Sequence, residues 1–338
     1  MDWLIKPQMK FKMNLENVKL NLIDEDPLFR FSDEEPAKIE MLKRSIETVG
    51  ILKPLILLPV AKKYKIVDGF KRFVVARESG ICHLPAWIVI EKTSMPRLLS
   101  LSILANYRNF SISEKARIIR ILRNLGLTSL QILEKFGNLI GISAEQFDSY
   151  LKISYYPDFL LSYISRNNLS LKQALSFDGL CDSEQKALFK IVSSLNFKGF
   201  DVYNILTDLK EIAIKEKTRV GRLIEELELS SLVQKKEFTR SEKTEKIKSR
   251  IKERKYPLLT KINAELVKLK GKLKPGKGIE VNWDERLETS GLKLIITISH
   301  PQILEEISRF LSRQETRKIL SVMLRVYHEG LPNKKNTD

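Results

Sequence analysis

Residues 66–73 read IVDGFKRF, and this stretch decides how the first part of the chain folds. Two β-branched residues lead into a glycine that two adjacent cations follow, so the pattern predicts a strand, a turn and a helix. The first N–H groups of a helix and its positive dipole end attract phosphate, and basic side chains add to that attraction. Gly69, Lys71 and Arg72 are therefore candidate phosphate-binding residues. On this spacing alone, a helix start whose two cations only face solvent is the slightly better interpretation.

The segments on either side of this stretch extend the pattern into a small mixed domain. Upstream, apolar residues at helical spacing predict a helix over 39–49, which Gly50 ends. Short β-rich runs predict strands at 55–60, 64–67 and 85–90, with a helix over 71–79 between the last two. This order predicts a small sheet with helices packed on it over residues 1–110.

The pattern changes to helices alone from about residue 111. Ser113 is the expected N-cap of the first helix, and Thr128 and Ser143 are expected to cap the next two. Further short helices are expected at 170–177, 183–195, 201–215 and 218–229, within a helical domain over 111–232. The pair 128–137 and 143–154, joined by a turn containing Gly141, has the spacing of a helix-turn-helix, although an ordinary helical hairpin has the same spacing.

Charge is concentrated in one part of the chain. The 59 Lys and Arg against 42 Asp and Glu give a net charge of +17, and residues 233–277 hold 16 of the cations and 5 of the acids. Such a basic segment attracts polyanions, most often nucleic acid, and its alternative is a solvated linker. We expect a basic linker here, with a basic helix in its later part.

Composition excludes several protein classes. The chain has two cysteines and three widely separated histidines, too few for a disulfide framework or a short metal motif, so no metal site is expected. No apolar run is long enough to cross a membrane, and the N-terminus lacks the apolar core of a signal peptide. The expected compartment is the cytoplasm.

Residues 278–338 are expected to form a small α/β domain that dimerises. Strands are expected at 279–283 and 292–298, then a helix that Pro301 opens and a final helix. Ile303, Ile307 and Phe310 form an apolar stripe that about 60 residues cannot fully bury in a monomer. Pairing with a second copy would cover it.

A last candidate lies between the first two domains. Asn106 and Arg108, within Leu104–Asn109, are placed to contact a ligand, or else to cap and bridge helices, which is the more common role.

Several of these segments together resemble one family. DPLFR at 26–30, IEMLKRSI at 39–46, GILKPL at 50–55 and YKIVDGFKR at 64–72 look like the N-terminal domain of ParB-type chromosome and plasmid partition proteins. The resemblance continues through Asn106 and the helix-turn-helix to about Asn168. It implies an N-terminal domain that binds CTP with Mg²⁺ and closes as a clamp, and a central domain that reads a centromere-like DNA site. It also implies a homodimer, a ParA-like ATPase partner and association with the nucleoid.

The resemblance assigns roles to individual residues and also shows departures. Gly69, Lys71 and Arg72 match the family's Gly-x-Arg-Arg nucleotide motif, and Asn106 matches the Asn of its Glu-Asn-x-x-Arg motif. Ala105 stands where the family has a glutamate associated with the triphosphate, its metal and hydrolysis, which implies slow or absent CTP hydrolysis. Asn109 replaces the motif's arginine, and the neighbouring Arg108 is the expected substitute.

An enzyme on the same fold is the alternative function. Sulfiredoxin and free-serine kinases share the fold that the resemblance implies. Sulfiredoxin has its catalytic cysteine where this chain has Phe70. A kinase needs carboxylates for metal and base, of which Asp68 is available while Ala105 is not. We therefore expect a DNA-binding protein, with a CTPase or a small-molecule kinase on the same fold as the alternative, and we assign no catalytic residue.

The expected DNA contacts fall into three groups. Lys115, Arg117, Arg120 and Arg123 are expected near phosphates, and Ser143, Gln146 and Ser149 are expected to read bases, with Lys152 as the cation of the second helix. The basic linker is expected to add sequence-independent affinity through Lys243, Lys246, Lys248, Arg250, Lys252 and Arg254. The expected fold is α+β and multidomain: a small ParB/sulfiredoxin-like α/β domain, an all-helical helix-turn-helix domain and a small C-terminal α/β domain.

Overall fold

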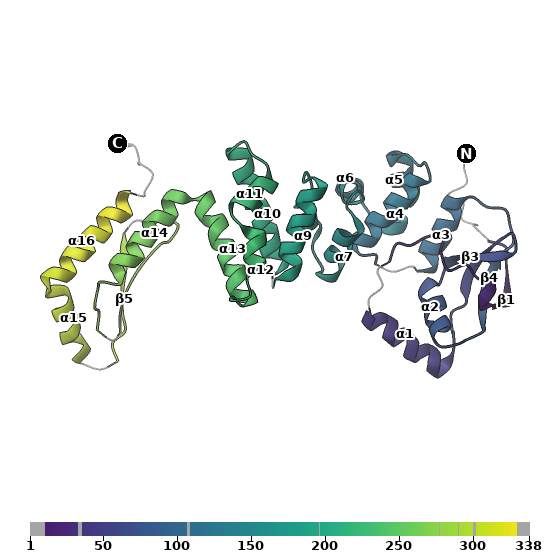
Figure 1. The fold of residues 1–338 in the computed structure, drawn as a ribbon, viewed down its shortest axis with the longest axis horizontal. Coiled ribbons are helices and arrows are strands. Elements are labelled where there is room, and N and C mark those ends of the chain that lie inside the picture. Colours follow the sequence, from purple (N-terminus) through teal and green to yellow (C-terminus); the bar gives the residue numbers. More distant parts are fainter. Residues whose placement is uncertain are drawn as a thin grey trace. The chain divides into compact units, whose positions relative to one another are not determined.

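The computed structural model describes residues 11–32, 36–106, 109–195, 197–276, 278–289, 291–299 and 302–329. The chain divides into two compact units, and the boundary between them falls close to residues 194–204. The structure is helix-rich with a small sheet in the first unit (Figure 1), which confirms the expected α+β class. Over the described ranges, none of the helices is both long and apolar enough to span a bilayer.

The sheet of the first unit has four strands in the order β1-β4-β2-β3. β1 (Met13–Lys19) runs antiparallel to β4 (His83–Val89), β4 is parallel to β2 (Leu55–Val60), and β2 is antiparallel to β3 (Lys63–Asp68). Sequence analysis found the last three strands and missed β1. Most of β1 is exposed, and its sequence MNLENVK has only Val18 as a β-branched residue, so it lacks the usual strand signal.

Helix α2 (Phe70–Glu78) follows β3 directly and covers the sheet, as the sequence predicts. Phe73 and Ala76 of this helix pack on Leu55, Ile66 and Leu84 of the strands, all fully or almost fully buried. α1 (Pro36–Val49) contacts α2, and Ile46 is its buried anchor. A short 3-10 turn, η1 (Leu20–Leu22), connects β1 to the segment that leads to α1.

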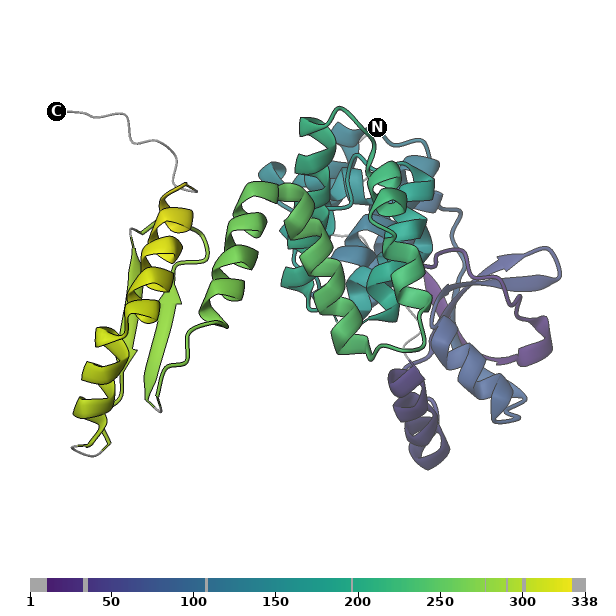
Figure 2. The same ribbon diagram turned by 60° about the vertical axis from the view of Figure 1, so that its left-hand side comes forward.

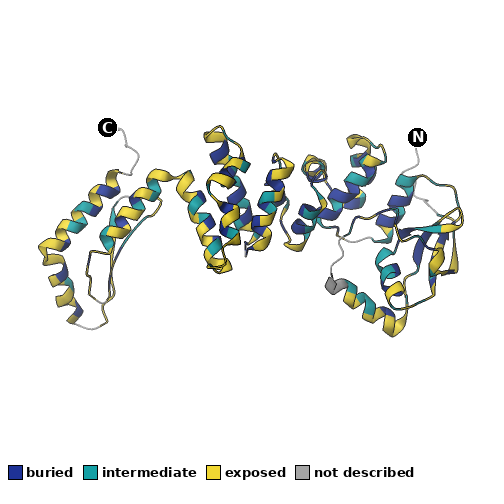
Figure 3. Ribbon diagram, viewed as in Figure 1, coloured by how far each residue is buried: buried dark blue, intermediate teal, exposed yellow. Residues whose placement is uncertain are grey.

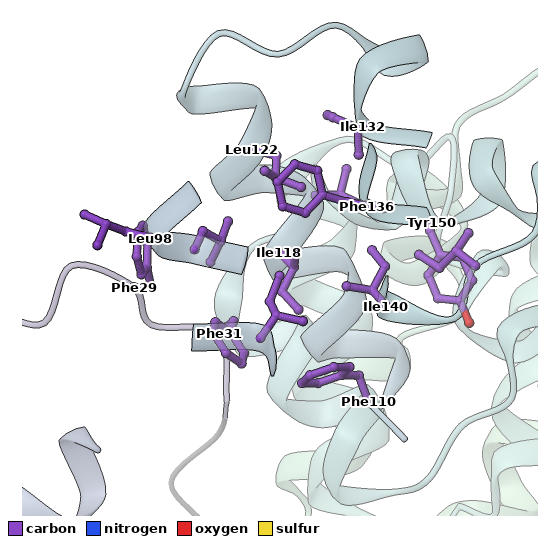
Figure 4. Packing of buried hydrophobic residues seen from close by; sticks show 14 of the residues in the cluster. Phe29, Phe31, Leu98, Phe110, Ile118, Leu122, Ile132, Phe136, Ile140 and Tyr150 are labelled. Carbon is purple, nitrogen blue, oxygen red and sulfur yellow. The ribbon is translucent and has the colours of Figure 1, made fainter. Parts of the chain in front are cut away.

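A second core of the same unit joins this α/β part to the helices that follow. It combines α3 (Met95–Ala105) with α4 (Ile112–Asn124), α5 (Ser129–Ile140) and α6 (Ala144–Ile153). Figure 4 shows Phe29 beside Leu98, and Ile118 and Leu122 close to Phe136. The α/β part and the first helices therefore share buried side chains.

Short capping motifs set where these helices start. Ser111 caps α4 and exchanges hydrogen bonds with Glu114, and Thr128 caps α5 in the same way with Gln131. The predicted cap at Ser113 is wrong, because Ser113 lies inside α4. It is fully buried there, and its hydroxyl donates to the carbonyl of Leu161 at 2.6 Å.

The remaining helices are short and follow one another along the chain. Their bounds are α7 (Asp158–Arg166), α8 (Leu171–Leu175), α9 (Asp182–Ser194), α10 (Gly199–Lys215), α11 (Val220–Glu226) and α12 (Leu229–Gln234). The helix expected over 218–229 corresponds to α11, which is a little shorter, whereas α12 was not expected; Glu228, with a left-handed backbone of φ 48°, separates the two.

Residues 240–270 form two packed helices, of which the second matches the basic helix expected in the later part of the linker and the first was not expected. α13 (Arg240–Lys255) buries Ile247 and Ile251, and α14 (Pro257–Lys270) buries Ile262 and Leu266. Each pair has helical i,i+4 spacing, which gives a highly charged helix one narrow apolar stripe. The division of the chain into four domains stays a prediction.

The last part of the second unit contains a two-stranded sheet and two helices. β5 (Ile279–Trp283) pairs antiparallel with β6 (Leu292–Ile296), and α15 (Gln302–Ser312) and α16 (Gln314–Glu329) follow. Figure 2 shows these helices, in yellow, alongside the light-green strands. Phe310, Met323 and Tyr327 form a core with Leu266 of α14. Much of this region is exposed (Figure 3), including the side chains of β6.

Candidate functional site

A cavity of about 280 Å³ lies in the first unit, where β3 ends and α2 begins. Its walls also include the segment before α1, Lys53 just before β2, and the end of α3. The described residues that line it are Pro27, Phe29, Arg30, Phe31, Ser32, Leu42, Lys53, Ile66, Val67, Asp68, Gly69, Phe70, Lys71, Arg72, Ser102 and Asn106. The cavity therefore brings together Gly69, Lys71, Arg72 and Asn106, four of the five residues expected to bind a nucleotide; Arg108 lies outside the described residues.

Gly69 is the N-cap of α2 and has a backbone that favours glycine. Its φ is +99°, and a Cβ built there would lie 2.9 Å from Cγ of Leu55, which is fully buried. A side chain would therefore meet both backbone strain and a clash with the core. Glycine lets β3 turn into α2 at this point, which places the first turn of the helix in the cavity wall.

Asp68 is the buried centre of a polar network under the cavity. The Nη2 atom of Arg72 donates to one oxygen of Asp68 at 2.6 Å, and the side-chain amide of Asn106 donates to the other oxygen. The Asn106 amide also donates to the carbonyl of Ser102 at 2.9 Å. Asn106 and Arg72 thus hold the end of α3 and the start of α2 to the end of β3.

Arg72 and Lys53 extend this network to the start of β2. The Nη1 atom of Arg72 donates to the carbonyls of Lys53 at 2.5 Å and of Pro54 at 2.9 Å. Lys53 is exposed, and its ammonium group donates to the carbonyl of Ala105 in the last turn of α3. Sequence reasoning did not select Lys53, because nothing in GILKPL indicates that position 53 meets a residue 52 positions later.

The cavity wall carries more positive than negative charge. Arg30, Lys53, Lys71 and Arg72 line it, and Asp68 is the one carboxylate among its described residues. The guanidinium group of Arg30 lies 4.6 Å from the ring centre of Phe70, and this cation–π contact joins the segment before α1 to the first residue of α2. This arrangement suits an anion such as the phosphates of a nucleotide.

The donor set suits a divalent metal poorly. Mg²⁺ is usually held by one or two carboxylates together with the phosphates of its ligand. Both oxygens of Asp68 already accept hydrogen bonds. Across the described ranges, no group of three or more His, Cys, Asp or Glu side chains is arranged to hold a metal ion.

The predicted helix-turn-helix is α5 and α6, joined through Gly141. Gly141 ends α5 with φ 65°, and Ile142 and Phe147 anchor the turn and α6 in the core. Ser143 and Gln146 are exposed at the start of α6, as base readout requires, and Ser149 is half-buried. Lys152 pairs with Asp178 at 3.1 Å.

The acid at the start of α6 stays ionised over a wider pH range than usual. A hydrogen bond with Ser143 lowers the pKa of Glu145. The exposed start of the second helix therefore carries negative charge, which opposes contact with phosphates.

Three of the four cations expected near phosphates are used inside the helical bundle. Arg120 donates to the carbonyls of Ser154, at 2.7 Å, and of Tyr156, and it pairs with Asp158 at 2.9 Å. Arg117 is buried and lies 3.1 Å from the hydroxyl of Ser162.

Lys115 is the third of these cations that is held inside the bundle, whereas Arg123 is not. Lys115 donates to the carbonyl of Gly141 at 2.6 Å, and burial lowers its pKa. Arg123 instead stacks on the exposed ring of Tyr155, 4.2 Å from its centre. Arg123 is thus the member of this set that contacts a surface aromatic side chain rather than a backbone carbonyl.

The cations of α13 also fall into two groups. Arg254 pairs with Glu216 and Glu226, Arg250 donates to the carbonyl of Leu227, and Lys243 donates to the carbonyl of Val233. These three hold α13 to the preceding helices.

The three remaining α13 cations that were expected to contact DNA, Lys246, Lys248 and Lys252, have weaker or more exposed contacts. Lys246 is exposed and lies 4.5 Å from the ring centre of Phe238. Lys252 is exposed with only a long 3.9 Å contact to Glu285, and Lys248 lies 3.3 Å from Glu245.

Comparison with known proteins finds a matching family model and similar proteins. Residues 6–107 match the family model of the ParB N-terminal domain. The chain is 29% identical over 157 residues to Stage 0 sporulation protein J of Bacillus subtilis (strain 168), which covers 46% of this chain and 52% of that protein. It is 26% identical over 215 residues to the probable chromosome-partitioning protein ParB of Borreliella burgdorferi, covering 61% and 77% of the two chains.

A solved structure is also similar. It is the C-terminally truncated chromosome-partitioning protein ParB from Caulobacter crescentus complexed with CTP-γ-S, at 21% identity and a TM-score of 0.26, covering 53% of this chain and 99% of that one. The match to the Bacillus relative spans about half of that relative's length.

Proposed function

Because this chain is a ParB-like protein, we propose that it binds double-stranded DNA in chromosome or plasmid partition and that CTP modulates this binding. The matched relatives are chromosome-partitioning and sporulation proteins, and the family model covers the segment that contains the cavity. The proposed place of action is the nucleoid, in the cytoplasm.

The observation that carries the proposal is the cavity at the end of β3. Gly69, Lys71, Arg72 and Asn106 match the family's nucleotide motifs, and all four line this one cavity together with Lys53 and Arg30. A ligand there would touch residues from β3, α2 and α3. Because α3 shares its core with α4, α5 and α6, a ligand that moves α3 would also act on the helix-turn-helix.

We assign the DNA contacts to α6 for base readout and to exposed cations for the backbone. Ser143 and Gln146 lie exposed at the start of α6, and Ser149 is next along the helix. Arg123, Lys246 and Lys252 are the predicted cations whose contacts leave them most accessible to phosphates. This assignment predicts modest sequence-specific affinity and a larger sequence-independent part.

The proposal is of nucleotide binding rather than turnover. Asp68 is the carboxylate expected to serve an enzyme here, and its oxygens accept hydrogen bonds from Arg72 and Asn106. A general base must be within hydrogen-bond reach of the proton that it takes, and a carboxylate already held in this way is poorly placed for that role. Ala105 supplies no acid.

A homodimer through the C-terminal part completes the proposal, with a ParA-like ATPase as its partner. The stripe expected at this contact is not available, because Ile303 and Phe310 are buried within the chain itself. The dimer contact is therefore assigned to the exposed apolar residues Leu294, Ile295 and Ile296 of β6 and Leu304 of α15. A second copy of the chain would cover them. Sedimentation of the full chain should give a dimer, and Ile295→Lys should shift it to a monomer. Ile214→Lys, at an exposed position on α10, should not.

The experiment that tests the proposal is a selection followed by a binding measurement. Duplexes are selected from a random library with the full chain, and fluorescence anisotropy then compares the selected duplex with a scrambled one, with and without CTP. We expect tighter binding to the selected duplex and a change in its dissociation rate on adding CTP. Equal affinity for both duplexes, unchanged by CTP, would refute the proposed function.

A further inference from the structure

The charges of the described residues that line the cavity leave little place for a divalent metal. Its lining includes the cations Arg30, Lys53, Lys71 and Arg72, whereas Asp68 is the one carboxylate among the described lining residues. That carboxylate accepts from Arg72 at 2.6 Å and from Asn106. A metal ion in this part of the cavity would compete with a guanidinium group for the same oxygen and would be repelled by the other cations.

Lys53 holds its ammonium group beside the end of α3. This group donates to the carbonyl of Ala105, in the last turn of α3. The side chain is exposed, and its backbone carbonyl is fixed by Arg72. An ammonium group has three N–H donors, so a hydrogen bond to one carbonyl leaves donors for phosphate oxygens.

We propose that this cavity binds the triphosphate group of a nucleotide without a divalent metal, and that the ammonium group of Lys53 supplies the charge that the metal would otherwise supply. The inference rests on the proposed nucleotide function and names the chemistry of its binding step. Lysine is a compact point charge that contacts phosphate in many binding sites, and metal ions at triphosphates serve to neutralise charge between neighbouring oxygens. A cation built into the chain can meet that need.

The first test compares CTP binding by the full chain with Mg²⁺ and with EDTA, by isothermal titration calorimetry. We expect the two dissociation constants to agree within about twofold, because no binding contact is lost with the metal. A weakening of about tenfold or more in EDTA would overturn the inference and leave the proposed nucleotide function standing.

The second test removes the ammonium group. Lys53→Met should weaken CTP binding by about tenfold or more in both conditions, whereas Lys53→Arg should retain most of the affinity. Lys62→Met is the matched control, since Lys62 is exposed in the β2–β3 turn and does not line the cavity. Melting temperatures of the three variants show whether each is folded. A folded Lys53→Met variant that binds CTP in EDTA as tightly as the unaltered chain would refute the role of Lys53.

The outcomes separate this inference from the proposed function. If CTP binds in neither condition, inorganic tripolyphosphate is the next probe. Binding of that probe in EDTA, lost in Lys53→Met, supports a metal-free anion site and contradicts the assignment to CTP. Absence of binding by both probes overturns the inference, while the DNA measurements above still decide whether the chain binds a specific duplex.

Discussion

The side-chain amide of Asn106, at the end of α3, donates to the carboxylate of Asp68, which lies 38 residues earlier at the end of β3. With Arg72 on the other oxygen, Asp68 joins the sheet, the start of α2 and the end of α3. The polar residues expected to touch a ligand therefore also hold the walls of the cavity together.

Asp68→Ala should destabilise the chain strongly. The carboxylate is buried, and its loss leaves the mostly buried guanidinium of Arg72 without its counter-charge, which costs about 3–5 kcal/mol of unfolding free energy. Urea denaturation measures the change. Asp26→Ala is the control, because the exposed Asp26 makes only a 3.8 Å contact with Lys65 and should show no measurable loss. Equal midpoints for the two variants would contradict the structural role of Asp68.

Gly69→Ala should cost more than the same change at Gly80. Both glycines have positive φ, +99° and +71°, but a Cβ at Gly69 meets Leu55 whereas a Cβ at Gly80 meets nothing within 4 Å. The shared backbone strain is about 1–2 kcal/mol, and the clash at Gly69 adds to it. Thermal melts of both variants check the difference. The prediction fails if Gly80→Ala is the less stable of the two.

Arg120→Ala and Arg123→Ala should separate stability from DNA binding. Arg120 donates to two carbonyls and to Asp158, so its removal should cost about 1.5–3 kcal/mol of unfolding free energy. Arg123 stacks on the exposed Tyr155, and its removal should cost at most about 1 kcal/mol.

The DNA measurement should show the opposite order. In anisotropy titrations of folded protein, Arg123→Ala should weaken binding more than Arg120→Ala. A larger effect of Arg120→Ala on DNA, at full stability, would show that its contacts in the bundle are exchanged for phosphates.

Lys246→Gln with Lys252→Gln should reduce the salt dependence of DNA binding. Each phosphate contact contributes about 0.9 to the slope of log affinity against log salt, so two lost contacts should flatten it by nearly 2. Arg254→Gln is the comparison, because Arg254 pairs with Glu216 and Glu226. It should lower stability and leave the slope unchanged. An unaltered slope in the double variant would show that α13 does not contact DNA.

Local signals in the sequence predicted much of the fold. The strand expected at 279–283 matches β5 residue for residue, and Thr128 is the cap of α5 as expected. These features depend on residues that are close in the sequence, so they can be predicted from the sequence alone. Arg72 and Asn106, both expected to bind a nucleotide, line the same cavity, but their hydrogen bonds to Asp68 were not predicted.

The misses depend on contacts between distant residues. β1 forms because the backbone of Met13–Lys19 pairs with that of β4. This pairing cannot be predicted from the sequence of residues 13–19 itself. Residues 240–255 have a strongly polar composition, and only the contacts of Ile247 and Ile251 show that they pack as a helix. Lys53 meets Ala105 only because β2 and α3 are folded on each other.

The pairing of β1 with β4 also has a kinetic consequence. Met13 faces Val89, so the edge strand cannot form until the whole intervening segment has been synthesised and has folded. Helices such as α4 and α5 close local contacts and carry their own start signals, so each can form within about a microsecond of leaving the ribosome. We expect docking of β1 to be the slow step for this unit, because the entropy cost of closing a long loop comes before the stabilising contacts between β1 and β4 form. A nascent chain that stalls before β4 would expose the free edge of β2 to other chains.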